Sequence, residues 1–130
     1  MVERKESQGL DEFEGVVESI EKEQGMSEGQ MQYHVTITPT SIEVGGKTGK
    51  LHEWIPLSKT SSEDAIAKGS VLDNYLRQVE ICLPAAKKSA TVGEALGLLV
   101  GKKFKFQKLE LGRAFDGNAA RQYAVPVQAL

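Results

Sequence analysis

The chain has 130 residues, of which 40% are hydrophobic and 26% are charged, and this composition is ordinary for a single globular domain. No apolar run approaches the roughly 18 residues of a membrane span, and the N-terminal residues lack the apolar core of a signal peptide. The single cysteine, Cys82, cannot form an internal disulfide. We therefore expect a cytoplasmic protein that does not partner with a membrane.

The net charge of −2 conceals an uneven distribution of charge along the chain. Residues 1–83 carry 8 Lys and Arg against 15 Asp and Glu, whereas residues 84–130 carry 8 against 3. Such an asymmetry can provide a basic groove, or it can reflect two solvated faces of opposite sign. The sequence leaves both interpretations open.

Residues 1–11 are polar and are predicted to be a loose N-terminal segment ahead of one domain, residues 12–130. The segment Glu12–Glu23 is predicted to be a strand because Gly15 and the two valines after it disfavour a helix, and Gly15 is expected to mark a bend or bulge.

The segment Met31–Thr38 is the clearest strand, because apolar and polar residues alternate along it. The apolar face is expected to hold Met31, Tyr33, Val35 and Ile37, and the polar face to hold Gln32, His34, Thr36 and Thr38.

A hairpin tip at 45–50 leads into a third strand, Leu51–Leu57. One face of that strand is expected to carry Leu51, Glu53, Ile55 and Leu57, and the other His52, Trp54 and Pro56. Pro56 suggests that the strand ends at a sheet edge.

Helical spacing follows the polar connection 58–69. Ser70 has the character of an N-cap, and the apolar positions after it are Leu72, Leu76, Val79 and Leu83. Pro84 ends this helix. Thr91 and Glu94 form a capping box that begins a second helical segment, which is expected to stop at Gly101 in the left-handed conformation. The sequence does not decide between one broken helix and two.

The period then changes to two in Gly101–Leu111, where Phe104 and Phe106 share one face and Lys103 and Lys105 the other. A loop, Gly112–Ala120, separates this strand from a last strand, Arg121–Val127.

Five short strands with helix between the third and fourth resemble the order of an OB-fold barrel. The resemblance covers about residues 12–128 and rests on Gly15, the hairpin Met31–Leu57, and Leu99–Lys102 leading into Phe104 and Phe106. The chain looks like the single-strand-binding OB domains of archaeal, phage and replication-protein-A-like proteins. It implies a mainly β, five-stranded barrel whose ligand face is the outer face of strands two and three, flanked by the first-to-second and fourth-to-fifth loops.

On that face the resemblance implies single-stranded DNA or RNA, held by base stacking and by Lys or Arg contacts to phosphates. The candidate binding residues are Trp54, His52, His34, Thr36, Lys47, Lys50, Lys103, Lys105, Arg113 and Arg121. The structural alternative is that Trp54 is covered and that the basic residues serve solubility. Inward positions are instead expected for Tyr33, Phe104, Phe106 and Tyr123.

Other chemistries find little support in the sequence. The GGKTGK stretch at 45–50 is not a P-loop, since position 41 is Ser41 and a strand follows. One cysteine and two histidines leave too few ligands for structural zinc, although His34, His52 and Glu53 could approach one another across the hairpin. We expect no cofactor and no enzymatic activity. The alternative function is an OB-fold protein-interaction module of a replication or phage-type assembly, which the acidic first half would suit.

Overall fold

A computed structural model describes residues 12–25, 30–40, 49–57, 61–62, 64–111 and 122–130. Its elements are β1 (Glu12–Gln24), β2 (Met31–Pro39), β3 (Leu51–Pro56), α2 (Val71–Cys82), the 3-10 helix η1 (Pro84–Lys88), α3 (Val92–Gly97), β4 (Lys103–Glu110) and β5 (Gln122–Ala129). The strands form one antiparallel sheet in the order β3-β2-β1-β4-β5. The mainly β prediction, with helices between the third and fourth strands, is confirmed.

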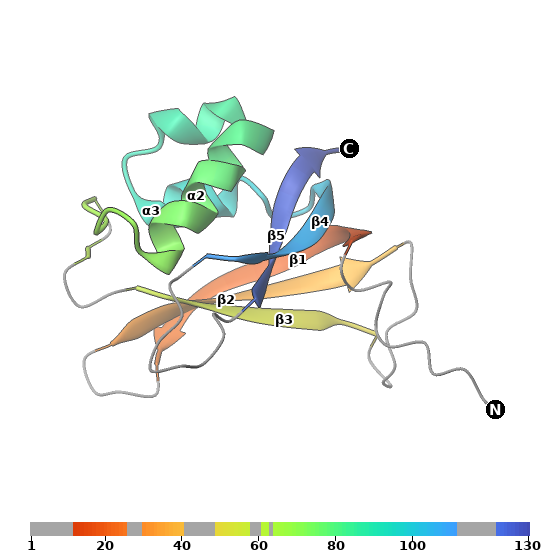
Figure 1. Ribbon diagram of the computed structural model, residues 1–130, viewed down its shortest axis with the longest axis horizontal. Coiled ribbons are helices and arrows are strands. Elements are labelled where there is room, and N and C mark those ends of the chain that lie inside the picture. Colours follow the sequence, from red (N-terminus) through yellow and green to blue (C-terminus); the bar gives the residue numbers. More distant parts are fainter. Residues whose placement is uncertain (1–11, 26–29, 41–48, 58–60, 63, 112–121) are drawn as a thin grey trace.

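The sheet is strongly curved. In Figure 1, β1, β2 and β3 lie across the view, whereas β5 runs at a steep angle to them, and the helices lie on one side of the sheet. No strand pairing joins the edge strands β3 and β5 within the described residues, so the backbone ladder remains open. The position of Pro56 at the end of edge strand β3 agrees with the sequence prediction.

Gly15 permits a close approach between β1 and β2. A Cβ atom at this position would lie 2.9 Å from Ile37 Cγ2 and 3.1 Å from the Thr38 carbonyl oxygen. The predicted bulge is present in β1, but the register shift lies between Val17 and Ser19 rather than at Gly15. Glycine is required at position 15 by contact with the neighbouring strand, while the extra residue that bends β1 comes after it.

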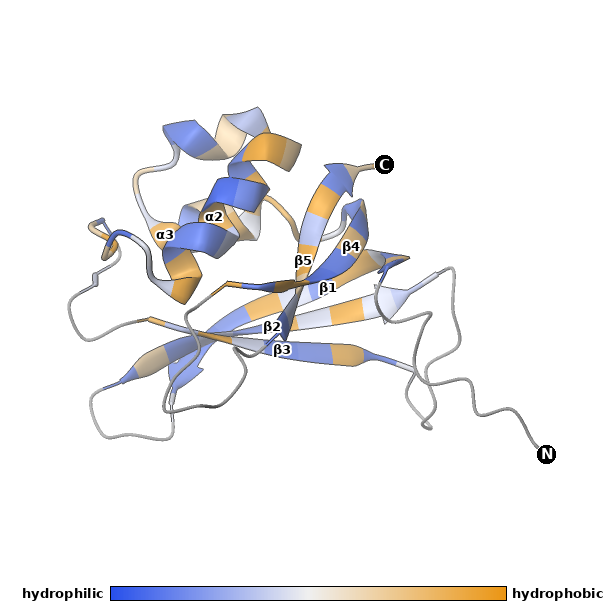
Figure 2. Cartoon of the chain, in the orientation of Figure 1, coloured by the Kyte–Doolittle hydropathy of each residue, from blue (hydrophilic) through white to orange (hydrophobic). Residues whose placement is uncertain are grey.

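The core lies between the inner face of the sheet and the helices. Figure 2 shows hydrophobic and hydrophilic residues alternating along several strands, as expected where one face is buried. The predicted inward residues Tyr33, Phe104, Phe106 and Tyr123 are all buried. α2 contributes its predicted stripe of Leu72, Tyr75, Leu76 and Val79.

The helix caps follow the sequence prediction. Ser70 Oγ accepts a hydrogen bond from the Asp73 N–H, and Thr91 Oγ1 accepts one from the Glu94 N–H. The Glu94 carboxylate also accepts a hydrogen bond from the N–H of Ala90, the residue before the N-cap. Pro84–Lys88 forms η1, so the described residues between β3 and β4 form two α-helices separated by a 3-10 helix.

Gly101 has φ of 81°, which confirms its left-handed conformation, but α3 itself ends at Gly97 and residues 98–101 form a turn. Its N–H donates to the Val17 carbonyl at 2.7 Å, and the Val17 N–H donates to the Lys102 carbonyl at 3.1 Å. The junction between helix and β4 is thereby fixed onto the central strand β1, next to the bulge.

The two sheet edges meet through side chains. The Glu53 carboxylate on β3 accepts a hydrogen bond from the Ala124 N–H on β5 at 3.1 Å. Tyr75 of α2 is fully buried. Desolvation of its phenol raises the pKa, and the nearby negative charge of Glu53 raises it further. No described group hydrogen-bonds to the Tyr75 hydroxyl. The hydrogen bond to the Glu53 side chain therefore links the two edge strands, β3 and β5.

β5 departs from the predicted alternation. Ala124 and Pro126 are buried as well as Tyr123 and Val125, because α2 packs against this strand. Cys82 of α2 is partly buried, and its Sγ donates to the Pro126 carbonyl at 3.3 Å. None of the described helices is long and apolar enough to cross a membrane.

Candidate functional site

Three aromatic rings lie together on the polar face of the β2–β3 hairpin. The register places His34 opposite Trp54 and Thr36 opposite His52, so alternation puts all four side chains on one face, as predicted. The rings of His34 and Trp54 are stacked, with centroids 4.7 Å apart and an interplanar angle of 15°. The His52 ring lies 5.9 Å from Trp54 and 5.0 Å from His34.

Hydrogen bonds fix the orientation of these rings. His34 Nε2 and His52 Nδ1 are 2.8 Å apart, so the protonated nitrogen of the two donates a hydrogen bond to the other. The indole Nε1 of Trp54 donates to Glu23 Oε1 at 2.9 Å. The second Glu23 oxygen lies 3.6 Å from His34 Nδ1. Glu23 thus holds both members of the stacked pair.

Sequence reasoning missed Glu23 as part of this site. It lies opposite Gln32 in the register and also accepts a hydrogen bond from the Gln32 amide at 3.0 Å. Because the bulge after Val17 changes which β1 residues face outward, the alternation could not have been extended correctly from Glu12 to Glu23. The glutamates of β1 are evident in the sequence, but the residues that they contact are not.

The exposure of the candidates differs from residue to residue. Trp54 is 37% exposed, which removes the alternative that the indole is covered by the described helices. His52 is exposed and the His34 side chain is 21% exposed. Thr36, in contrast, is only 9% exposed, so it offers little surface to a ligand. Its role in binding stays a prediction.

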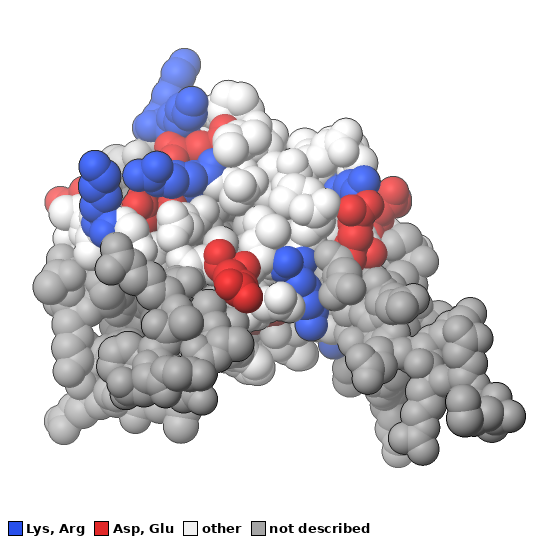
Figure 3. Space-filling model, in the orientation of Figure 1, with Lys and Arg blue, Asp and Glu red and all other residues white. Residues whose placement is uncertain are grey.

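Each described lysine among the candidates forms an ion pair with a glutamate of β1. Lys50 Nζ lies 2.8 Å from Glu18 Oε1, Lys105 Nζ lies 2.7 Å from Glu12 Oε1, and Lys103 Nζ lies 3.6 Å from Glu14 Oε2. Figure 3 shows basic and acidic side chains interspersed on the face that it displays rather than gathered by sign. A phosphate at these lysines must compete with a carboxylate that is already present.

The ion pairs perturb the titration of their members. The Lys105 hydrogen bond, followed by that of Gln107, lowers the pKa of Glu12, and the Lys50 hydrogen bond lowers the pKa of Glu18. The pKa of Lys105 is correspondingly raised by its hydrogen bond to Glu12. Both partners of that pair are therefore held in their charged forms near neutral pH.

Three further candidates, Lys47, Arg113 and Arg121, lie outside the described residues. Within the part of the chain that the structure describes, no group of three His, Cys, Asp or Glu residues is arranged to hold a metal ion. Burial raises the pKa of the Cys82 thiol, which disfavours the reactive thiolate.

The aromatic face formed by His34, His52 and Trp54 offers an indole and two imidazoles on β2 and β3, and Glu23 of β1 adds a carboxylate beside them. These groups can stack on a planar ligand and form hydrogen bonds with it. Comparison of the sequence with protein-family models finds no matching family, and comparison with curated proteins finds no matching protein.

Proposed function

We propose that this protein is a single-stranded nucleic-acid-binding module of the OB type, and that bases stack on the aromatic face formed by His34, His52 and Trp54. The observation that carries the proposal is the exposed, stacked set of rings on β2 and β3. Aromatic side chains on this pair of strands are a means by which OB-folds hold single strands without strong sequence preference.

The arrangement of the elements supports the OB assignment. The strand order, the helices between β3 and β4, and the strong curvature agree with a partly open five-stranded barrel. The bond between Glu53 and the Ala124 N–H lies where such a barrel would close its β3–β5 seam.

The ion pairs decide what kind of binding to expect. Because Lys50, Lys103 and Lys105 already contact carboxylates, phosphate contacts gain less than they would at free lysines. Stacking should therefore contribute the larger share of affinity, and the dependence on salt should be weaker than for a groove of unpaired lysines.

The same ion pairs favour a second candidate function. A face that carries Glu18 and Glu23 beside an exposed indole could bind a basic protein surface instead of a polyanion. This alternative is the protein-interaction module of a nucleic-acid-processing assembly.

Fluorescence titration tests the proposal directly, because Trp54 is the single tryptophan of the chain. Oligo-thymidine should quench its emission in a saturable manner at low salt, with weaker binding at high salt. Trp54→Ala should weaken binding of a labelled oligo-thymidine about 5- to 150-fold, the equivalent of roughly 1–3 kcal/mol for one stacked base.

Ile81→Ala provides the matched control, since Ile81 is an exposed apolar residue of α2, 66% exposed, outside the aromatic face. It should leave the affinity unchanged. An absence of quenching at low salt, or equal affinity for the Trp54→Ala variant, would reject nucleic-acid binding at this face and favour the protein-interaction module.

A further inference from the structure

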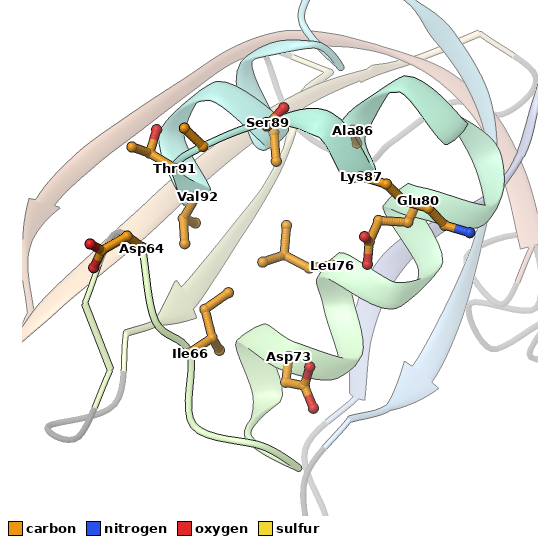
Figure 4. A pocket seen from close by; sticks show the side chains of 12 residues that line it. Asp64, Ile66, Asp73, Leu76, Glu80, Ala86, Lys87, Ser89, Thr91 and Val92 are labelled. Carbon is orange, nitrogen blue, oxygen red and sulfur yellow. The ribbon is translucent and has the colours of Figure 1, made fainter.

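A second surface feature lies in the helical layer, separate from the aromatic face. A hollow of about 200 Å³ is lined by α2, η1, α3 and the segment around Ile66. In Figure 4 the side chains of Ile66, Leu76 and Val92 point toward its centre. Leu76 and Val92 are buried residues of the core cluster, so the floor of the hollow is formed by the core itself.

Small residues of η1 and α3 leave part of the hollow open, although Lys87 of η1 and Val92 of α3 also line it. Ala86 and Ala95 are among its lining residues, and neither can reach across to α2. At about 200 Å³ the space is smaller than the roughly 300–1,000 Å³ of a typical small-molecule site. It suits a single anchoring side chain inserted by a larger partner, which is how many protein interfaces concentrate their binding energy.

The rim is acidic. Figure 4 shows Asp64 and Glu80 at opposite ends of the hollow, with Asp73 at its lower edge. Asp73 is already engaged, because it accepts the Gly69 N–H at 2.7 Å and pairs with Arg77 at 3.4 Å. Asp64 bonds only to the neutral Ser62 hydroxyl in the described structure, and Glu80 forms no ion pair with a described residue.

Lys87 is the single basic side chain among the described lining residues, and it is exposed. Asp64 and Glu80 form no ion pair within the described residues, and two such carboxylates at the ends of an apolar floor match a segment with an apolar residue between basic ones. They do not match nucleic acid, whose phosphates they would repel. The charge therefore distinguishes this surface from the stacked rings on β2 and β3.

We propose that this hollow is a docking site for a short basic segment of a partner protein, which inserts one apolar side chain between Ile66, Leu76 and Val92 and directs Lys or Arg toward Asp64 and Glu80. The site is independent of what the aromatic face binds. A chain with both surfaces could attach a partner to whatever occupies β2 and β3.

The probe is a short amphipathic peptide of leucine and lysine, added to the ¹⁵N-labelled full chain and followed by amide chemical shifts. Shifts should concentrate at Leu76, Glu80 and Val92. The variant Asp64→Lys with Glu80→Lys should weaken binding about tenfold or more at low salt. A peptide with glutamate in place of lysine should not bind.

Glu110→Lys is the matched control, because Glu110 is exposed at the end of β4 and does not line the hollow. Like each of the two substitutions at the hollow, it replaces one negative charge by a positive one, and it should leave the affinity for the peptide unchanged. An absence of shifts, shifts centred on the β1 glutamates, or equal weakening by Glu110→Lys would each overturn the proposal. Oligo-thymidine should not displace the peptide, which separates this result from the outcome at the aromatic face.

Discussion

The Ala124 N–H of β5 donates a hydrogen bond to the Glu53 side chain of β3, and removal of this contact between the edge strands should open the seam between β3 and β5. Ala124 is 2% exposed, so Glu53→Ala leaves its N–H buried without this acceptor. A hydrogen bond to a charged group contributes roughly 1.5–3 kcal/mol, and an orphaned buried donor costs a similar amount. We expect Glu53→Ala to lower the free energy of unfolding by about 1.5–3 kcal/mol.

Amide hydrogen exchange measures this effect locally. If the seam opens by that amount, the Ala124 amide should exchange about 10- to 150-fold faster in Glu53→Ala than in the natural chain. Glu53→Gln keeps an acceptor oxygen and should retain most of the protection. Glu110→Ala, which removes an exposed carboxylate at the end of β4, should change neither quantity.

Unchanged Ala124 exchange in Glu53→Ala would refute the reasoning that the side chain links the edges. Equal loss in the Gln and Ala variants would show that the negative charge matters and the acceptor geometry does not. Urea denaturation of each variant separates local opening from global destabilisation.

Three further predictions concern stability. Tyr75→Phe should raise the free energy of unfolding by about 1–2 kcal/mol, because it removes a buried hydroxyl that no described group satisfies; a lower melting temperature in calorimetry would reveal an unrecognised partner. Gly15→Ala should lower the free energy of unfolding by about 1–3 kcal/mol, because the added Cβ clashes with β2. Gly97→Ala, where a Cβ meets nothing within 4 Å, should raise it by about 0.5–1 kcal/mol. Urea denaturation measures both changes. The pKa values of Glu12 and Glu18 are lowered in the folded state, so the stability that these carboxylates contribute is present above the ordinary value of 4.5 and is lost as the pH falls below it. If a chain with Glu12→Gln and Glu18→Gln lost as much stability in acid as the natural chain, this prediction would be contradicted.

The sequence predicted the elements whose signals are local. Alternation identified β2, with Tyr33 inward and His34 outward, and helical spacing identified the buried stripe of α2. The caps at Ser70 and Thr91 and the left-handed Gly101 also depend on short-range chemistry, so they too could be predicted.

Features that depend on tertiary packing could not be predicted. β5 reads as an alternating strand, yet Tyr123, Ala124, Val125 and Pro126 are all buried, and the register pairs Pro126 rather than Val125 with the inward Phe106. The bulge at Glu18 follows from how β1 serves two partners, β2 and β4, along different parts of its length. Glu23 enters the aromatic face only because of that bulge, so no periodicity in the sequence could have placed it there.

The uneven charge of the chain has a structural explanation that the totals alone could not give. β1, from the acidic half, lies directly beside β4, from the basic half, and Glu14 is opposite Lys105 in the register. The ion pairs are nevertheless diagonal, Glu12 with Lys105 and Glu14 with Lys103, so they span successive rungs of the ladder. A slip of one residue would move each charged side chain to the other face and break both pairs. Two carboxylates of the acidic half thus pair with two lysines of the basic half where β1 and β4 align, and Lys103 and Lys105 cannot be counted as part of a free basic groove. Any polyanion that binds this face has to depend on the stacked rings.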